Sequence, residues 1–237
     1  IEGRWVKANA VFGIYPAESQ GDDIQVFRKD GKTPLCTFHT LRQQTRKPEG
    51  TPNLALADFL ASGAEGGDYV GAFVVTAGLG IESKLEQFEK ENDDYSSIML
   101  KALADRLAEA FAELLHAKIR REYWGYAADE NLNLGEIIRE KYIGIRPAPG
   151  YPAQPDHTEK EILFKMLEAE KNSGVTLTES LAMYPTASVC GLIFARQEAH
   201  YFSVGDILPD QLEDYSKRKN VKTEEVRRWL SPYLYNP

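Results

Sequence analysis

The sequence predicts an α+β fold, with strands in hairpins and helices in groups. Its β-branched and aromatic runs occur as neighbours that a short turn can join, which is typical of hairpins and meanders. Its helical runs follow one another in groups, which disfavours βαβ winding. The chain has 237 residues, of which 43% are hydrophobic. This length fits one large domain or two small ones, with enough apolar residues for a sizeable core.

The first third of the chain is expected to form a meander. Val6 to Tyr15 is rich in β-branched and aromatic residues, and Pro16 is expected to end that strand. Asp30-Gly31 is a tight-turn signal between two further runs. A later run is almost wholly apolar, which suits a central strand covered on both faces. The expected strands are 6–15, 24–28, 34–39 and 69–76.

The longest expected element is a helix over about residues 95–123, where large apolar residues recur at helical spacing with alanines between them. At ~1.5 Å per residue it is about 40 Å long. Gly144 ends a later helix, and Asp156 with Glu159 predicts a capping box at the start of the next. Residues 187–195 and 200–207 are expected to pair as an antiparallel hairpin. The other expected helices are 54–60, 83–90, 134–142, 156–172, 210–219 and 223–230.

The composition argues against several classes of function. The net charge is −8 and the pI is about 5.2, which disfavours binding to nucleic acid or to an anionic membrane surface. The sequence shows no apolar run of membrane-spanning length and no apolar signal region. Cys36 and Cys190 lie far apart without metal-ligand spacing. We therefore expect reduced packing cysteines in a cytoplasmic protein.

No set of catalytic residues or metal ligands stands out. The sequence contains no phosphate-binding loop of the Walker type, no GxSxG and no HExxH. Gly78-Leu79-Gly80 lacks the third glycine of a dinucleotide fingerprint and is interpreted as a turn. The four histidines are not paired at ligand spacing, so a metal site is not expected.

The most informative motif is the run Arg-Pro-Ala-Pro-Gly-Tyr at residues 146–151, followed by Pro152. The prolines fix φ and favour an extended, stiff loop. Gly150 permits a positive φ or close approach of a ligand to the backbone. Arg146 is suited to engage both oxygens of a carboxylate, and Tyr151 to stack on a ring. The alternative is that Arg146 pairs with a structural carboxylate such as Glu140 and that the prolines only stiffen a connection.

Three further sets of residues are candidates, each with a plain structural alternative. Asp105 and Glu109 share a helix face that either carries a cationic partner or is a solvated stripe. Tyr201 and Phe202 point to opposite faces of the expected strand, so one of them is able to line a pocket and the other to pack. Arg42, in Leu-Arg-Gln-Gln at 41–44, is either a contact for a partner or an exposed cation at a strand end.

Taken together, the motifs resemble the C-terminal activation domain of cobalamin-dependent methionine synthase, and the resemblance spans nearly all of residues 1–237. It is strongest in the loop at 146–151 and in the helix from Lys101 to Ala110. The other matching runs are Ala8–Gly13, Pro16-Ala17, Asp22–Ile24, Leu41–Gln44, Leu56–Phe59, Tyr69–Phe73, Asp93–Tyr95, Tyr123–Tyr126, Leu177–Ser180 and Met183–Pro185.

The resemblance implies a C-shaped α+β domain in which a curved antiparallel sheet is flanked by helices and which binds S-adenosylmethionine. Arg146 falls on the residue that holds the ligand carboxylate, and backbone groups of Pro147 and Ala148 approach the ligand. The remaining residues implied near the ligand are Gly150, Tyr151, Tyr201, Phe202, Glu109 and Glu140. Phe202 replaces a second tyrosine of the family, which removes a hydroxyl contact. The family's domain begins upstream with an Asp-Trp segment that has no match here, so a fragment without its N-terminal part is expected.

In that family the domain presents S-adenosylmethionine for reductive methylation of oxidised cobalamin, which supports methyl transfer from methyltetrahydrofolate to homocysteine. The resemblance thus implies part of a methyltransferase that does not turn over alone. Its implied partners are a separate cobalamin-binding domain and a flavodoxin-like reductase. The alternatives are an interaction module that docks these partners without a small ligand, and a structural domain with no ligand. A stand-alone methyltransferase is disfavoured because no nucleotide-binding sheet or catalytic base is visible.

Overall fold

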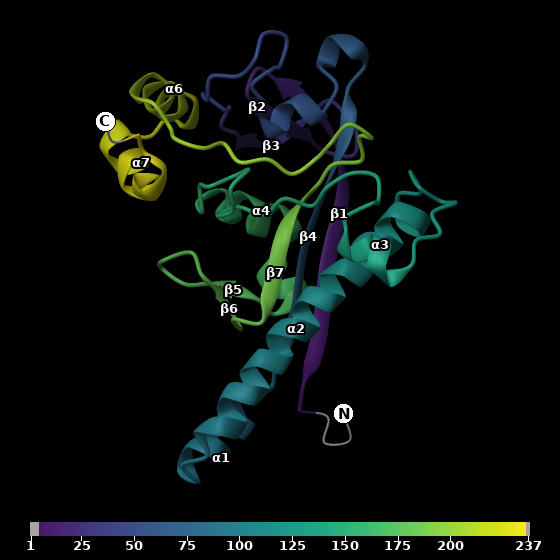
Figure 1. Ribbon diagram of the computed structural model, residues 1–237, viewed down its shortest axis with the longest axis vertical. Coiled ribbons are helices and arrows are strands. Elements are labelled where there is room, and N and C mark those ends of the chain that lie inside the picture. The colour runs from purple at the N-terminus through teal and green to yellow at the C-terminus, as the bar shows by residue number, and fades with distance from the viewer. Residues whose placement is uncertain (1–4, 236–237) are drawn as a thin grey trace. The chain divides into compact units, whose positions relative to one another are not determined.

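The computed structural model describes residues 5–235 and shows a five-stranded sheet with strand order β3-β2-β1-β4-β7 (Figure 1). The strands are β1 (Lys7–Gln20), β2 (Asp23–Phe27), β3 (Pro34–His39), β4 (Asp68–Leu79) and β7 (Ser188–Ile193). β2 pairs antiparallel with both β1 and β3. The prediction of an antiparallel sheet flanked by helices is therefore confirmed.

The described chain divides into two compact units, and three of the strands contribute residues to both. Unit 1 takes the described part of Ile1–Gly13, with Ala72–Asn131 and Leu163–Gly191. Unit 2 takes Ile14–Gly71, Leu132–Ile162 and the described part of Leu192–Pro237.

Unit 1 is organised around the long helix α2 (Asp94–Lys118), which packs against α1 (Glu82–Lys90). Its small residues Ala104 and Ala108 are almost fully buried beside Ala77 of β4, since alanine permits close packing. The helix continues as a π-helical turn, Ile119–Tyr123, so the predicted 95–123 helix is nearly correct. Unit 1 also contains α5 (Ala169–Ser173), most of which falls within the helix expected over 156–172. It further contains a small sheet of β5 (Thr176–Leu177) and β6 (Met183–Tyr184), and this sheet was not predicted.

Unit 2 contains α6 (Pro209–Lys219) and α7 (Thr223–Trp229), which lie side by side (Figure 1). They bury an apolar cluster, and α6 also contacts β3. Short turns complete the unit: the 3-10 turns Leu56–Phe59, Gly63–Glu65 and Ser231–Tyr233, and the helix α3 (Leu134–Ile138). The α6–α7 cluster consists of Leu41, Val204, Ile207, Leu212, Tyr215, Val226 and Leu230.

The predicted hairpin between residues 187–195 and 200–207 is wrong. Only the first of these segments is a strand, β7, and its continuation Phe194 forms an antiparallel bridge with Ile145 instead. Residues 200–207 lie outside the named strands, and the backbone of Val204 donates to Pro152 O at 2.9 Å. Tertiary partners therefore override the strand propensity of this segment.

Several predicted ends and caps also differ. Pro16 does not end β1, because the ladder with β2 begins at Ala17 and the missing N–H of Pro16 breaks no bond in it. The expected helix 54–60 is only a 3-10 turn, and the expected helix 134–142 ends at Ile138, before Glu140 with φ +54°. The helix expected over 156–172 is interrupted at Glu168, where φ is +46°, and its first part is α4 (Glu159–Leu167).

Candidate functional site

The loop at residues 146–151 lies in unit 2 and is held at its start by the end of β7. Ile145 exchanges two backbone hydrogen bonds with Phe194, at 3.0 and 2.9 Å, and Pro147 O accepts from Leu192 N at 2.9 Å. The loop therefore behaves as a short added strand at this point. Some of its backbone groups are therefore already hydrogen-bonded to β7 and its continuation.

Tyr201 fixes the head of the loop. Its hydroxyl accepts the backbone N–H of Arg146 at 3.0 Å, and its side chain is also hydrogen-bonded to that of Tyr142, which is 8% exposed. Burial raises the pKa of the Tyr201 phenol, although these two hydrogen bonds and the charge of Arg146 act in the opposite direction. Tyr201 is therefore a neutral hydroxyl at neutral pH, and it contacts the loop through the backbone of Arg146.

Glu140 belongs to the same neighbourhood. Its negative charge raises the pKa of Tyr201, whereas the positive charge of Arg146 lowers it, so both charged groups act on that phenol. The carboxylate-binding role of Arg146 stays a prediction, and so does the alternative of a structural ion pair with a carboxylate such as Glu140.

Gly150 is required where the loop turns back. Its φ is +97°, and a Cβ at this position would lie 2.3 Å from His157 Cε1. Gly150 N donates to Gln154 O at 2.7 Å, and the His157 ring is in turn held by Lys160, with 2.8 Å between Nζ and Nδ1. Glycine is therefore needed here for its positive φ, as expected, and because the His157 ring fills the space of a side chain.

The other predicted site residues divide into exposed and packed ones. Tyr151 is 62% exposed, which leaves its ring accessible. Pro147 is buried and Ala148 is half-buried. Phe202 packs against the α6–α7 cluster and makes an edge contact with Phe59 at 6.0 Å between ring centroids. Phe202 therefore serves the core of unit 2.

Glu109 is the one predicted site residue that lies in unit 1. It is exposed on α2, as is Asp105. Its proximity to a ligand stays a prediction. Arg42, predicted as an exposed cation or a partner contact, is half-buried, and its guanidinium binds Asp22 at 2.6 Å and Asp58 at 2.7 Å within unit 2. Its pKa is raised, first by the hydrogen bond with Asp58.

Behind the loop lies buried polar support that the sequence did not predict. Gln154, 3% exposed, donates from Nε2 to His39 O at 2.7 Å. Glu159 does not close the predicted capping box, because its Oε2 accepts from His39 N at 3.0 Å while Oε1 pairs with Lys219. Asp156 Oδ1 does accept Thr158 N at 2.8 Å, next to the start of α4. The polar run at 156–160 was a visible signal, but its partners are distant in sequence.

Asp156 and Glu159 share the ammonium of Lys219 and respond to it differently. Burial acts to raise the pKa of Asp156, but the charge of Lys219 and hydrogen bonds from Thr158, Lys219 and Tyr215 outweigh it and hold that pKa below its ordinary value. For Glu159, burial prevails over Lys219 and raises the pKa. Two carboxylates that share one cation therefore titrate apart.

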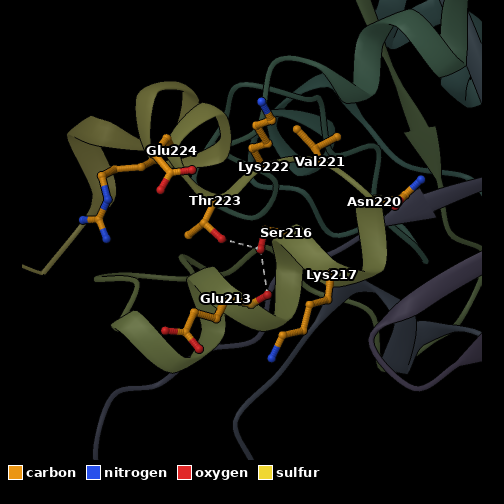
Figure 2. Close-up of a pocket in the computed structure, with 9 residues that line it drawn as sticks. Glu213, Ser216, Lys217, Asn220, Val221, Lys222, Thr223 and Glu224 are labelled. Atoms are coloured by element: carbon orange, nitrogen blue, oxygen red, sulfur yellow. Dashed lines mark hydrogen bonds between the residues drawn. The ribbon is translucent and has the colours of Figure 1, made fainter.

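A hollow of about 810 Å³ lies elsewhere in unit 2, at the junction of α6 and α7 (Figure 2). Figure 2 shows polar side chains along it, with Ser216 Oγ bonded to Thr223 Oγ1 at 3.0 Å. None of the predicted site residues lines it.

Within residues 5–235, no group of three or more acidic, histidine or cysteine side chains is placed to hold a metal ion. The described helices include none long and apolar enough to cross a membrane, and the described cysteines form no disulfide.

Comparisons with known proteins agree with this architecture. Residues 1–220 match the family model described as "Vitamin B12 dependent methionine synthase, activation domain". The whole chain is also similar to a solved structure described as the MetH reactivation domain bound to AdoHcy. The sequence identity is 50%, the TM-score is 0.96, and the match covers 100% of this chain and 73% of that chain.

Proposed function

Because this chain belongs to the family of vitamin B12-dependent methionine synthase activation domains, we propose that it binds S-adenosylmethionine in unit 2 through the loop at 146–151. The family's parent enzyme is a cobalamin-dependent methyltransferase, so a cobalamin-binding domain is its partner. The domain presents S-adenosylmethionine to that partner for reactivation of the cofactor. The observation that carries the proposal is the Arg146 loop, held in place by Tyr201.

The ligand chemistry fits the residues around the loop. S-adenosylmethionine supplies a methyl group already activated by its sulfonium, so the protein has to bind and orient it and needs no general base. Arg146 offers a guanidinium for the carboxylate of the amino-acid end. The exposed ring of Tyr151 offers a stacking surface. A related domain whose structure contains AdoHcy, the demethylated product of this ligand, supports the same choice.

Titration calorimetry with S-adenosylmethionine tests the anchor. Arg146→Ala removes a charge-assisted hydrogen bond and is expected to cost about 1.5–3 kcal/mol of binding free energy. Arg28→Ala is the matched control, because Arg28 is an exposed arginine of the same unit at the end of β2. Equal affinities for wild type, R28A and R146A would overturn the role of Arg146.

A thermal-shift series separates ligand binding from docking alone. A ligand that binds only the native state raises Tm with its concentration. A rise with S-adenosylmethionine supports the proposal, whereas no rise at any concentration favours an interaction module without a small ligand.

We further propose a flavodoxin-like reductase as electron donor and a cytoplasmic location. The support for the reductase is the family resemblance, and binding of a reduced flavoprotein to the parent enzyme tests it.

A further inference from the structure

The segment that follows the Arg146 loop is buried although it is polar. Gln154 is 3% exposed, and Asp156 and Glu159 are 0% exposed. Burial of a carboxylate is costly unless it is paired and hydrogen-bonded, because the charge loses its hydration. Two such groups within four residues therefore require a partner brought from elsewhere in unit 2.

Lys219, in the last turn of α6, is that partner. Its Nζ donates to Asp156 Oδ2 and to Thr158 Oγ1, both at 2.9 Å, and pairs with Glu159 Oε1. An ammonium has three donors, and these three acceptors match them in number. The rings of Tyr215 and Trp229 lie 5.3 and 5.7 Å from the same nitrogen. All three polar contacts go to one segment, residues 156–159.

A short series of hydrogen bonds connects this ammonium to the loop. Glu159 Oε2 accepts from His39 N at 3.0 Å, and His39 O accepts from Gln154 Nε2 at 2.7 Å. Gln154 O in turn accepts from Gly150 N at 2.7 Å. Gln154 is also only two residues before Asp156 along the chain. A displacement of residues 156–159 therefore reaches Gly150 both through the backbone and through His39.

We propose that Lys219 is a positioning residue for the loop at 146–151. By compensating Asp156 and Glu159, it holds Gln154, and through Gln154 the backbone of Gly150, in the geometry that binds the ligand. The identity of that ligand, S-adenosylmethionine, rests on the proposed function. Without the ammonium, the two carboxylates repel each other and seek water or protons, and the segment moves with them. The folded protein then binds the ligand more weakly.

A merely structural lysine would lower stability and leave the affinity of the folded protein unchanged. The test therefore compares Lys219→Met with Val226→Ala. Met keeps the long unbranched shape without the charge, and Val226 is a fully buried member of the α6–α7 cluster on the neighbouring helix. Both variants are measured at a temperature at which they are folded, by calorimetry with S-adenosylmethionine and by hydrogen exchange of residues 146–154 without ligand.

K219M is expected to bind roughly tenfold more weakly, since a small misplacement of a binding loop has effects of this order or larger, and to exchange faster at the Gly150 amide. V226A is expected to keep the wild-type Kd and the wild-type exchange of the loop. Adding Glu159→Gln to K219M removes one uncompensated charge while the amide oxygen still accepts from His39 N, so part of the affinity returns. Wild-type Kd and wild-type loop exchange in K219M would overturn the proposal.

The two readouts also separate this inference from the proposed function. If wild type does not bind S-adenosylmethionine, the proposed function fails, and loop exchange still decides the role of Lys219. If K219M does not fold, the double variant K219M/E159Q carries the same test, because it removes one of the two buried negative charges and leaves Asp156 without its ammonium. Unchanged affinity and loop exchange in the double variant would then count against the proposal.

Discussion

Replacing Gly150 by alanine tests the geometry of the binding loop at its tightest point. With φ at +97°, alanine is strained by about 1–3 kcal/mol. Alanine also restricts the unfolded chain, which offsets about 0.4–1 kcal/mol. The new methyl group lies 2.3 Å from His157 Cε1, so the ring has to move and lose its contact with Lys160, at a cost of about 0.5–1.5 kcal/mol. The strain and the clash together exceed the offset, and we expect a net loss of about 2 kcal/mol of unfolding free energy.

Urea unfolding measures this loss, and a second glycine isolates its two parts. Gly66 has φ +99°, and a Cβ there meets nothing within 4 Å, so Gly66→Ala reports the backbone strain without the clash. G150A is expected to be less stable than G66A by the cost of displacing the His157 ring. In the double variant with His157→Ala, G150A should cost about as much as G66A. A G150A protein as stable as wild type would refute the reasoning, and so would equal costs of G150A and G66A.

Two further perturbations follow from the same neighbourhood. Tyr201→Phe removes the oxygen that accepts Arg146 N–H, so urea unfolding should show a loss of about 1–2 kcal/mol; an unchanged unfolding free energy would show that this hydrogen bond carries no weight. The pKa of Asp156 is lowered in the folded protein, so its stabilisation is present above its unfolded pKa and is lost as pH falls through the folded value. The pKa of Glu159 is raised, so the folded state is favoured below the unfolded pKa and loses stability as pH rises through the folded value. In unfolding free energies measured against pH, Asp156→Asn should reduce the loss of stability at acid pH, and Glu159→Gln should reduce the loss of stability as the pH rises. Identical pH profiles for both variants would contradict the opposite pKa shifts of the two carboxyl groups.

Elements whose signal is local were predictable. The apolar run at 69–76 predicted β4, most of whose side chains are buried, because a strand covered on both faces needs no polar positions. The helical spacing in 95–123 predicted α2, although the large side chains Leu103 and Leu107 are about half exposed whereas Ala104 and Ala108 are buried. The sequence therefore indicated the element correctly and its buried face less well.

Pairing between distant segments was not predictable in the same way. Residues 187–195 and 200–207 both carry strand residues, and proximity in sequence favoured a hairpin. The structure instead pairs Phe194 with Ile145, some fifty residues earlier in the chain. Strand propensity describes a half-buried surface and does not select the partner.

The candidate site shows the same division. Arg146 and Tyr201 were predicted and are in contact through the Arg146 backbone. Asp156 and Glu159 were noticed, but as a capping pair, because a local motif was sufficient to explain them. Lys219, which neutralises both, lies about sixty residues further on. A lysine near the end of a helix has an ordinary explanation as a favourable charge at that terminus, so the sequence alone gives no reason to bring it to the loop.

The prolines that make the loop stiff also make it dependent on few contacts. Proline fixes φ but has no N–H, so Pro147, Pro149 and Pro152 cannot donate to any neighbour. The backbone N–H groups of Arg146 and Gly150 both donate hydrogen bonds, that of Arg146 to the Tyr201 hydroxyl and that of Gly150 to Gln154 O. A loop with many donors tolerates the loss of one, whereas here each lost donor removes a large part of the anchoring. For this reason single changes at Tyr201, Gly150 and Lys219, which leave Arg146 itself intact, are expected to weaken the same binding site.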